Sequence, residues 1–485
     1  MEHFDVLIVG AGLSGVGAAA QLTTECPDKT FAILEGRAAM GGTWDLFRYP
    51  GIRSDSDMYT LGYRLRPWSD PKAIADGPAI LSYIRDTARE FNVDEKIRYN
   101  QRVKQASWST DESRWTVEVE ADGATVQMTC GFLYLCTGYY DYESGYTPQW
   151  SGMERFHGPI IHPQKWTDDI DYAGKRVVVI GSGATAVTLV PAMAETAEHV
   201  TMLQRSPTYI LSLPSEDRIA NALRKTLPAK AAYALSRWKN VLIAIGLYAF
   251  SRKRPDTMKR LIAKGVKKEL GEEYHKRHFT PTYNPWDQRL CLVPDSDLFH
   301  AIRDGKASVV TDQIESFTEN GLQLESGERL DADIIITATG LVLKLMAGLQ
   351  LIVDGNPVDM SKTMAYKGMM YSNVPNAASA FGYTNASWTL KCDLTAEYVC
   401  RLLKYMDEHG FAQCTPRVID PTITPEPVLD FKSGYVQRAL DTLPSQGSKP
   451  PWRLHQNYIK DLRMMRYGQI NDGTMEFRSA STLKQ

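Results

Sequence analysis

Residues 4–9 (FDVLIV) and the turn after them, residues 10–15 (GAGLSG), decide the fold. The first stretch is a short apolar, β-branched run, which is typical of a buried parallel strand. The turn has the GxGxxG pattern, and the small residues at 16–20 (VGAAA) suit a helix packed closely against a sheet. A second predicted strand, residues 30–34, ends at Glu35. This order of features predicts one unit of a doubly wound α/β fold.

Each element of this unit has a use in binding a dinucleotide. Gly10 allows the tight turn, Gly12 lets the backbone approach a pyrophosphate, and Gly15 permits close contact between helix and strand. The helix N-terminus offers free N–H groups and a positive dipole to phosphates. Glu35 can accept hydrogen bonds from ribose hydroxyls. A glycine-rich turn alone can be purely structural, but the agreement of all these elements predicts a dinucleotide site.

The same pattern recurs in the second third of the chain. Residues 175–180 (KRVVVI) form a predicted strand, and residues 181–186 (GSGATA), which begin at Gly181, form a GxGxxA turn. The next predicted strand, residues 199–203, leads to Gln204 and Arg205 rather than to an acid. An acid would repel a 2′-phosphate, whereas a guanidinium can bind one bidentately. The first unit therefore suits FAD or NAD, and the second suits NADPH; the alternative for Arg205 is a solvated surface arginine.

Two further predicted strands end in TG turns, at residues 132–138 (FLYLCTG) and 334–340 (IIITATG). Such segments carry the chain between the domains of flavoproteins that bind two dinucleotides. The predicted fold is α/β, with two Rossmann-like dinucleotide-binding domains, the NADPH domain inserted into the FAD domain, and a helical insertion. The predicted boundaries are 1–145 for the first part of the FAD domain, 150–335 for the NADPH domain with a helical insertion at about 212–280, and 336–485 for the second part of the FAD domain and a C-terminal tail.

Composition excludes several classes of protein. The 55 Lys and Arg against 57 Asp and Glu give a net charge of -2, which disfavours nucleic acid as a partner. The number of cysteines, seven, is odd, and no two of them have the spacing CxxC. Both facts disfavour a disulfide framework, a metal cluster and a disulfide reductase. The acidic start with a short apolar run is unlike a signal peptide, and no stretch approaches the length of a transmembrane helix. We therefore expect a cytoplasmic protein with reduced thiols.

Residues 216–278 hold 16 Lys and Arg against 6 Asp and Glu, so the rest of the chain has 39 against 51. Within this segment, residues 241–250 (VLIAIGLYAF) are strongly apolar and precede Arg252, Lys253 and Arg254. An amphipathic basic helix can lie on an anionic membrane, which would make the protein peripheral to it. The alternative is a helical insertion with a buried apolar face and a solvated basic face. Ten apolar residues are too few to span a bilayer, and we favour the buried insertion.

Family resemblance adds to this interpretation. Residues 156–167 (FHGPIIHPQKWT) resemble the FxGxxxHxxxW(P/D) fingerprint of type I Baeyer–Villiger monooxygenases, with Thr167 in place of the last residue. Residues 41–55 (GGTWDLFRYPGIRSD) look like the GGTW…RYPG…D segment of the same family. The resemblance covers nearly the whole chain and is closest to the ethionamide-activating branch, in the strings IRSDSDMYTLG, IGSGATAVTLVPA, NPWDQRLCLVP and GYTNASWTLK.

The resemblance implies an FAD-dependent, NADPH-consuming monooxygenase. Such an enzyme inserts one oxygen atom from O2 next to a ketone carbonyl, through a C4a-peroxyflavin, and gives an ester or lactone. It also implies oxidation of sulfides to sulfoxides and a small-molecule ketone or sulfide as substrate. From the cysteine spacing, we expect no metal site. Two alternatives stay open: a flavin monooxygenase limited to heteroatoms, and a flavin and NADPH protein that acts as a redox sensor or oxidase without oxygenating a substrate.

The resemblance also assigns residues to roles. Arg289 matches the active-site arginine of the family and Asp55 the acid that orients it, while Gln288 replaces a lysine that helps many relatives bind the 2′-phosphate. We expect His162 to be structural, and Trp388 either approaches the active site or packs in the core. By position, the FAD contacts are Ser14, Glu35, Thr43, Trp44, Asp45, Leu46, Asp55 and, through its backbone, Val103. The NADP contacts are Arg53, Ser54, Asp55, Ser182, Gly183, Ala184, Thr185, Ala186, Val187, Gln204 and Arg205.

Overall fold

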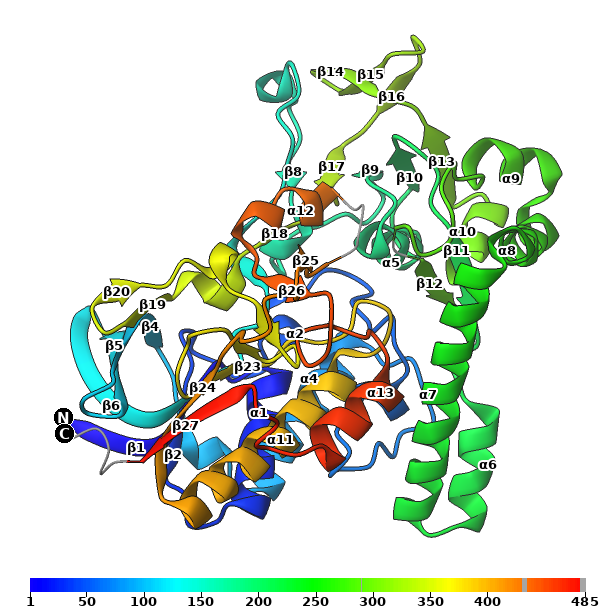
Figure 1. The fold of residues 1–485 in the computed structure, drawn as a ribbon. Helices are drawn as coiled ribbons and strands as arrows, with labels where there is room; N and C mark the ends of the chain where they lie inside the picture. Colours follow the sequence, from blue (N-terminus) through cyan, green and yellow to red (C-terminus); the bar gives the residue numbers. More distant parts are fainter. Residues whose placement is uncertain (289, 430–433, 480–485) are drawn as a thin grey trace.

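The strand predicted at residues 4–9 is β1 (Glu2–Val9), and it lies inside a nine-stranded sheet (Figure 1). The computed structural model describes residues 1–288, 290–429 and 434–479. Val6, Leu7 and Ile8 are fully buried, which explains why this run is apolar without alternation. The spatial order of the strands is β20 (Asn356–Pro357), β19 (Gln350–Val353), β4 (Gln101–Ser109), β5 (Arg114–Ala121), β6 (Ala124–Leu135), β1, β2 (Phe31–Leu34) and β3 (Ile97–Arg98), with β23 (Ala377–Ser379) also paired to β6.

The turn after β1 is nearly free of side chains, and this lets α1 (Leu13–Glu25) start directly at the end of the strand. Gly10 has a φ of +103°, and a Cβ there would lie 2.6 Å from the carbonyl oxygen of Cys136, just beyond β6. A Cβ on Gly15 would lie 1.8 Å from the carbonyl oxygen of Gly10. Only glycine fits both positions. The helix is thereby held close to the sheet, and α11 (Trp388–His409) packs against α1.

The second sheet has five strands, all parallel, and it contains the second predicted glycine turn. Its order is β13 (Ala307–Thr311), β10 (His199–Gln204), β9 (Arg176–Ile180), β17 (Ile334–Thr337) and β8 (Ile160–Ile161). The turn joins β9 to α5 (Ala184–Met193), and α10 (Asp297–Arg303) packs against α5. The predicted α/β fold with two Rossmann-like units is confirmed.

The chain passes between the two sheets twice, and the two passages lie side by side. β7 (Tyr140–Gly145) leads away from the first sheet and pairs antiparallel with β18 (Leu341–Leu343), which leads back. The first sheet takes its strands from residues 2–135 and 350–379, and the second from residues 160–337. One unit is therefore inserted into the other, as the predicted fold class requires. We call the unit around the nine-stranded sheet the first body and the unit around the five-stranded sheet the second body.

Smaller elements complete both bodies. The other described α-helices outside residues 218–278 are α2 (Thr43–Leu46), α3 (Met58–Leu61), α4 (Gly77–Glu90), α12 (Gly434–Gln437) and α13 (Tyr458–Leu462). The other described strands form two- and three-stranded sheets: β11 (Ile210–Leu213), β12 (Cys291–Pro294), β14 (Ile314–Thr318), β15 (Gly321–Leu324), β16 (Arg329–Asp331), β21 (Ala365–Tyr366), β22 (Met370–Tyr371), β24 (Phe411–Pro416), β25 (Pro425–Pro427), β26 (Ser445–Gly447) and β27 (Met475–Ser479).

Four helices make up the basic insertion: α6 (Arg218–Thr226), α7 (Ala229–Lys253), α8 (Pro255–Leu270) and α9 (Glu272–His278). Of these, α6 and α7 run along one edge of the molecule (Figure 1). The expectation that the apolar face of residues 241–250 is buried holds only in part: Val241 is buried and Ile245 packs against the core, but Leu242, Ile243 and Phe250 are 53%, 57% and 39% exposed. Within the described residues, no helix is long and apolar enough to cross a bilayer.

Polar contacts between α7 and the first body explain this orientation. Arg237 is 5% exposed, donates to the carbonyl oxygens of Gly62 (2.6 Å) and Tyr59 (2.9 Å), and pairs with Asp393 at 2.7 Å. The hydroxyl of Tyr233 donates to a backbone carbonyl oxygen of the first body at 2.9 Å. A buried charge needs such partners, so the side of α7 that carries Arg237 faces inward, together with the buried Tyr233 and Val241, and other apolar residues of the helix are left outside.

Replacing Gly15 by alanine tests the close contact beneath α1. We expect Gly15→Ala to lower the free energy of unfolding by about 2–3 kcal/mol, because the added methyl group overlaps the Gly10 carbonyl. Gly246→Ala is the matched control: no heavy atom lies within 4 Å of its Cβ position on α7, so this variant should be as stable as the wild type or slightly more so. Chemical unfolding followed by circular dichroism measures both, and equal stabilities for the two variants would contradict the packing argument.

Candidate functional site

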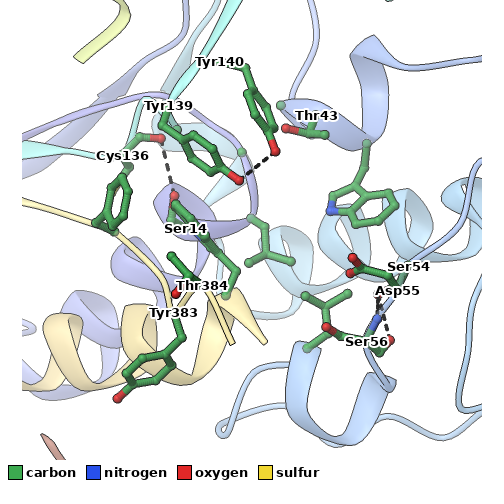
Figure 2. Close-up of a pocket in the computed structure, with 18 of the residues that line it drawn as sticks. Ser14, Thr43, Ser54, Asp55, Ser56, Cys136, Tyr139, Tyr140, Tyr383 and Thr384 are labelled. Atoms are coloured by element: carbon green, nitrogen blue, oxygen red, sulfur yellow. Dashed lines mark hydrogen bonds between the residues drawn. The ribbon is translucent and has the colours of Figure 1, made fainter. Parts of the chain in front are cut away.

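Three adjoining cavities lie where the two bodies meet, and Tyr140 lines all three. The first, shown in Figure 2, lies against the glycine turn after β1. The third, of about 750 Å³, lies against the glycine turn after β9. Thr43 and Asp55 line both the first and the second cavity, while Thr185 and Gly340 line both the second and the third. The shared residues show that the cavities form one row from the first glycine turn to the second.

Helix N-termini face both ends of this row. Gly12 and Ser14 at the start of α1 line the first cavity, and residues 181–185 at the start of α5 line the third. Neither helix has a side-chain cap at its N-cap glycine, and neither has an acidic residue in its first turn. The positive end of each helix dipole and its N–H groups are therefore directed toward a cavity, which suits the binding of phosphates.

Glu35 is buried directly behind the first turn. Its two carboxylate oxygens accept hydrogen bonds from the backbone N–H groups of Ala11 (2.8 Å) and Arg37 (2.9 Å). Burial raises the pKa of Glu35 above its ordinary value. The carboxylate thus braces the glycine turn, and each oxygen keeps a second lone pair that can accept a hydrogen bond from a ribose hydroxyl.

Asp45 lies behind the wall of the first cavity rather than on it. Its carboxylate is 3% exposed and pairs with Arg37 at 2.8 Å and with Arg85 at 3.4 Å. These ion pairs hold the short helix α2, which places Thr43 and Trp44 on the cavity wall. Asp45 therefore acts on this cavity by fixing the position of α2, and its side chain does not line the cavity.

Two predicted residues lie at the junction of the bodies. Arg53 lines the second cavity and forms an ion pair with Asp297 of α10, so it joins the first body to the second. Asp55 lines the first and second cavities, where two dinucleotides would approach each other. Arg289, the predicted catalytic arginine, lies outside the described residues; the preceding residue, Gln288, lines the third cavity.

Arg205 and Ser182 lie on the third cavity. The Arg205 side chain is exposed, and among the described residues it has no carboxylate partner. Ser182 shares a hydrogen bond with Thr208 at 2.7 Å. The position of an unpaired guanidinium one strand away from the start of α5 is that expected for binding a 2′-phosphate.

Some residues predicted by position do not reach a cavity with their side chains. The amide nitrogen of Gln204 is buried and donates to the carbonyl oxygen of His278 (2.7 Å) and to Thr311 (2.9 Å). The side chains of Ala186 and Val187 are buried in the core beneath α5. These three residues have only their backbones left for a nucleotide. Leu46 and Val103 are half-buried, and their side chains pack against the cores.

An aromatic wall closes the first cavity, and sequence reasoning identified only part of it. Trp388 stacks on Tyr139 with ring centroids 4.8 Å apart, and Phe381 lies 5.1 Å from Trp388. The hydroxyls of Tyr139 and Tyr140 are 2.7 Å apart (Figure 2). Trp388 therefore combines the two predicted alternatives, because it lines the cavity and also packs against the hydrophobic core. The signal for the tyrosines was their place just after the carboxyl end of a parallel strand, where ligands bind in α/β folds.

His162 lines the second cavity, but backbone groups occupy both of its ring nitrogens. Nδ1 accepts from the N–H of Gln164 (3.2 Å), and Nε2 lies 3.0 Å from the carbonyl oxygen of Gly340, to which it donates. Burial lowers the pKa of His162. This geometry is that of a neutral structural histidine. It ties the segment that carries the fingerprint to the turn after β17.

Comparison with known families identifies related proteins. Residues 71–406 match the family described as flavin-binding monooxygenase-like, and residues 8–67 match an NAD(P)-binding Rossmann-like domain. The FAD-containing monooxygenase EthA of Mycobacterium tuberculosis is 56% identical over 478 residues, which cover 98% of each chain. The probable FAD-binding monooxygenase AlmA of Acinetobacter baylyi is 48% identical over 480 residues, which cover 98% of this chain and 96% of the relative.

Solved structures share the fold at lower identity. An oxidized steroid monooxygenase bound to NADP superimposes with a TM-score of 0.77 at 22% identity, covering 98% of this chain and 99% of the other. An open crystal structure of cyclohexanone monooxygenase gives a TM-score of 0.74 at 20% identity, covering 99% and 100%. These similarities extend the shared fold over the full length of the chain.

The depressed pKa of His162 predicts a pH-dependent contribution to stability. Because the folded state favours neutral imidazole, this contribution is complete above the ordinary pKa of about 6.5 and is lost as the pH falls toward the lower folded-state value. Glutamine cannot titrate, so we expect the Tm of the wild type to fall between pH 7 and pH 5 by about 2 °C more than that of His162→Gln. Thermal unfolding across this range measures the difference, and parallel profiles would contradict the assignment.

Proposed function

The chain belongs to the flavin-binding monooxygenase-like family, and we propose that it is an FAD- and NADPH-dependent Baeyer–Villiger monooxygenase. The proposed reaction inserts one oxygen atom of O2 next to a ketone carbonyl to give an ester or lactone, and oxidises sulfides to sulfoxides. One observation carries this proposal: two uncapped helix N-termini face a row of cavities that join at Asp55 and Tyr140.

The residues around the row fit the two cofactors. In the proposed arrangement α1 binds the FAD pyrophosphate, the Glu35 carboxylate accepts a hydrogen bond from a ribose hydroxyl, and Thr43 and Trp44 border the flavin. On the other side, α5 binds the pyrophosphate of NADPH and Arg205 binds its 2′-phosphate. When bound, these cofactors supply the hydride and the activation of O2.

The chain itself is proposed to supply charge, orientation and a dry pocket. Arg289 stabilises negative charge that develops on oxygen during the reaction, and Asp55 orients its guanidinium. Tyr139, Trp388 and Phe381 form an apolar wall that excludes water and holds an apolar ketone or sulfide. Arg53, fixed by Asp297, holds the two bodies in register at the point where the nicotinamide would meet the flavin.

The experiment that tests this function is a panel of ketones and sulfides with product measured against NADPH consumed. An ester that carries one atom of labelled O2 supports the proposal. Sulfoxides without any ester would favour a monooxygenase limited to heteroatoms. Hydrogen peroxide that accounts for all the oxygen consumed would favour a redox sensor or oxidase.

Arg289→Ala separates the oxygenation step from NADPH oxidation. We expect this variant to keep oxidising NADPH while ester formation falls by about a hundredfold or more, because the developing oxyanion loses its charged partner. Arg303→Ala, which removes an exposed arginine that pairs with Glu269, serves as the control and should form ester normally. Normal ester formation by Arg289→Ala would remove Arg289 from the proposed role.

Arg205→Ala tests the coenzyme preference. We expect the KM for NADPH to rise about thirtyfold and the KM for NADH to change less than about twofold, because only NADPH carries the 2′-phosphate that the guanidinium would bind. Arg205→Lys keeps the charge but loses the planar fork, so its KM for NADPH should lie between those of the wild type and the alanine variant. Steady-state kinetics with both coenzymes give the result, and equal changes for the two would remove Arg205 from the phosphate site.

A further inference from the structure

The outward side of α7 carries a row of exposed apolar side chains. Leu235, Trp238, Leu242, Ile243 and Phe250 are between 39% and 57% exposed, and their spacing places them on one side of the helix, opposite the buried Tyr233 and Arg237. In the described part of the chain, nine of the fourteen large exposed apolar side chains lie at residues 213–261, so this concentration is local. We call these five residues of α7 the apolar stripe.

Basic residues lie at both ends of the stripe. Lys230 is exposed near the start of α7, and Lys253 and Arg254 are exposed at its end. Between Lys230 and Arg252, the only charged residues of this fully described helix are the buried Arg237 and Lys239, which pairs with Asp217. The next helix adds further exposed bases, at Arg260, Lys264 and Lys268.

The charge of the insertion limits what can cover the stripe. A second copy docked symmetrically through this face would bring together two insertions that each hold ten more basic than acidic residues over residues 216–278. An anionic surface is complementary instead. An apolar row flanked by Lys and Arg, with a tryptophan in it, is the pattern of a helix that lies in the interface of a lipid bilayer.

We propose that the apolar stripe and the basic residues around it dock the protein onto a membrane surface that contains anionic phospholipids. α7 has 25 residues and is about 37 Å long, and it would lie in the membrane plane, because its other side is bound to the first body. The row of cavities with the two glycine turns contains none of the stripe residues, so docking leaves that site accessible.

A cavity of about 410 Å³ next to the stripe offers a place for a lipid headgroup. Trp238 of the stripe lines it together with Lys230, Arg64, Arg237 and Arg466. Both Arg64 and Arg466 pair with one carboxylate, that of Glu397, and Arg237 pairs with Asp393. Four positive charges thus meet two negative ones, and the remaining excess suits one phosphate group.

Flotation with lipid vesicles tests the proposal on the full-length protein. The vesicles are phosphatidylcholine alone, or phosphatidylcholine with about one-quarter phosphatidylglycerol, each at about 0.05 M and 0.5 M salt. We expect binding to the anionic vesicles at low salt, and at least about tenfold weaker binding to neutral vesicles or at high salt. Equal binding to neutral and anionic vesicles, or no binding to either, would overturn the proposal.

Paired variants locate the contact. We expect Leu242→Ser with Ile243→Ser to weaken vesicle binding about tenfold, because two apolar side chains no longer enter the interface. Val418→Ser with Ile419→Ser, at two exposed apolar positions outside the insertion, is the control and should bind as the wild type does. Lys230→Glu with Lys253→Glu should likewise weaken binding to the anionic vesicles, and Lys306→Glu, at an exposed base outside the insertion, should not.

Further measurements make these outcomes decisive. NADPH oxidation without vesicles should be the same in all variants, which shows that they are folded. Unchanged binding by the stripe variant would overturn the proposal. So would a concentration-dependent dimer in analytical ultracentrifugation that the stripe variant abolishes, because a second copy of the chain would then be the occupant of the stripe.

Discussion

The architecture depends on two glycines, each at a turn where the backbone lies so close to the end of a neighbouring strand that a side chain would not fit. A Cβ on Gly10 would lie 2.6 Å from the carbonyl oxygen of Cys136, and a Cβ on Gly181 would lie 2.3 Å from that of Ala338. Each contact lets a helix begin directly above the sheet, with its N-terminal N–H groups directed into a cavity. The packing of each body and the chemistry of each site therefore have the same steric origin.

The site exists because the two bodies are connected by paired strands rather than by a loose linker. Tyr140 begins β7 and Leu341 begins β18, and both line the cavities at the junction. The ion pair of Arg53 with Asp297 adds a second connection across the same junction. Asp55 of the first body and Thr185 of the second consequently line one cavity, although 130 positions separate them in the chain.

Helix α7 of the insertion differs from the two cores, because it buries a charged side chain and exposes several apolar ones. The buried side of α7 carries Arg237, held by carbonyl oxygens and Asp393, while much of its apolar surface faces outward. Carbonyl oxygens and a carboxylate of the first body satisfy the buried Arg237, and Tyr233 and Val241 pack into the core beside it. A net charge of -2 for the chain conceals this region, since its positive excess cancels against the acidic remainder.

The sequence by itself determined the two Rossmann-like units and the place of the glycine turn in each, because strand periodicity and the absence of side chains at Gly10, Gly15 and Gly181 are local properties. Only the tertiary structure decided which predicted residues reach a cavity. Gln204 turns into the core because His278 and Thr311, distant in sequence, offer it hydrogen bonds. The sequence also did not predict which residues of α7 face outward. An apolar pattern shows that a helix has two sides, but the partners of its polar residues decide which side meets water.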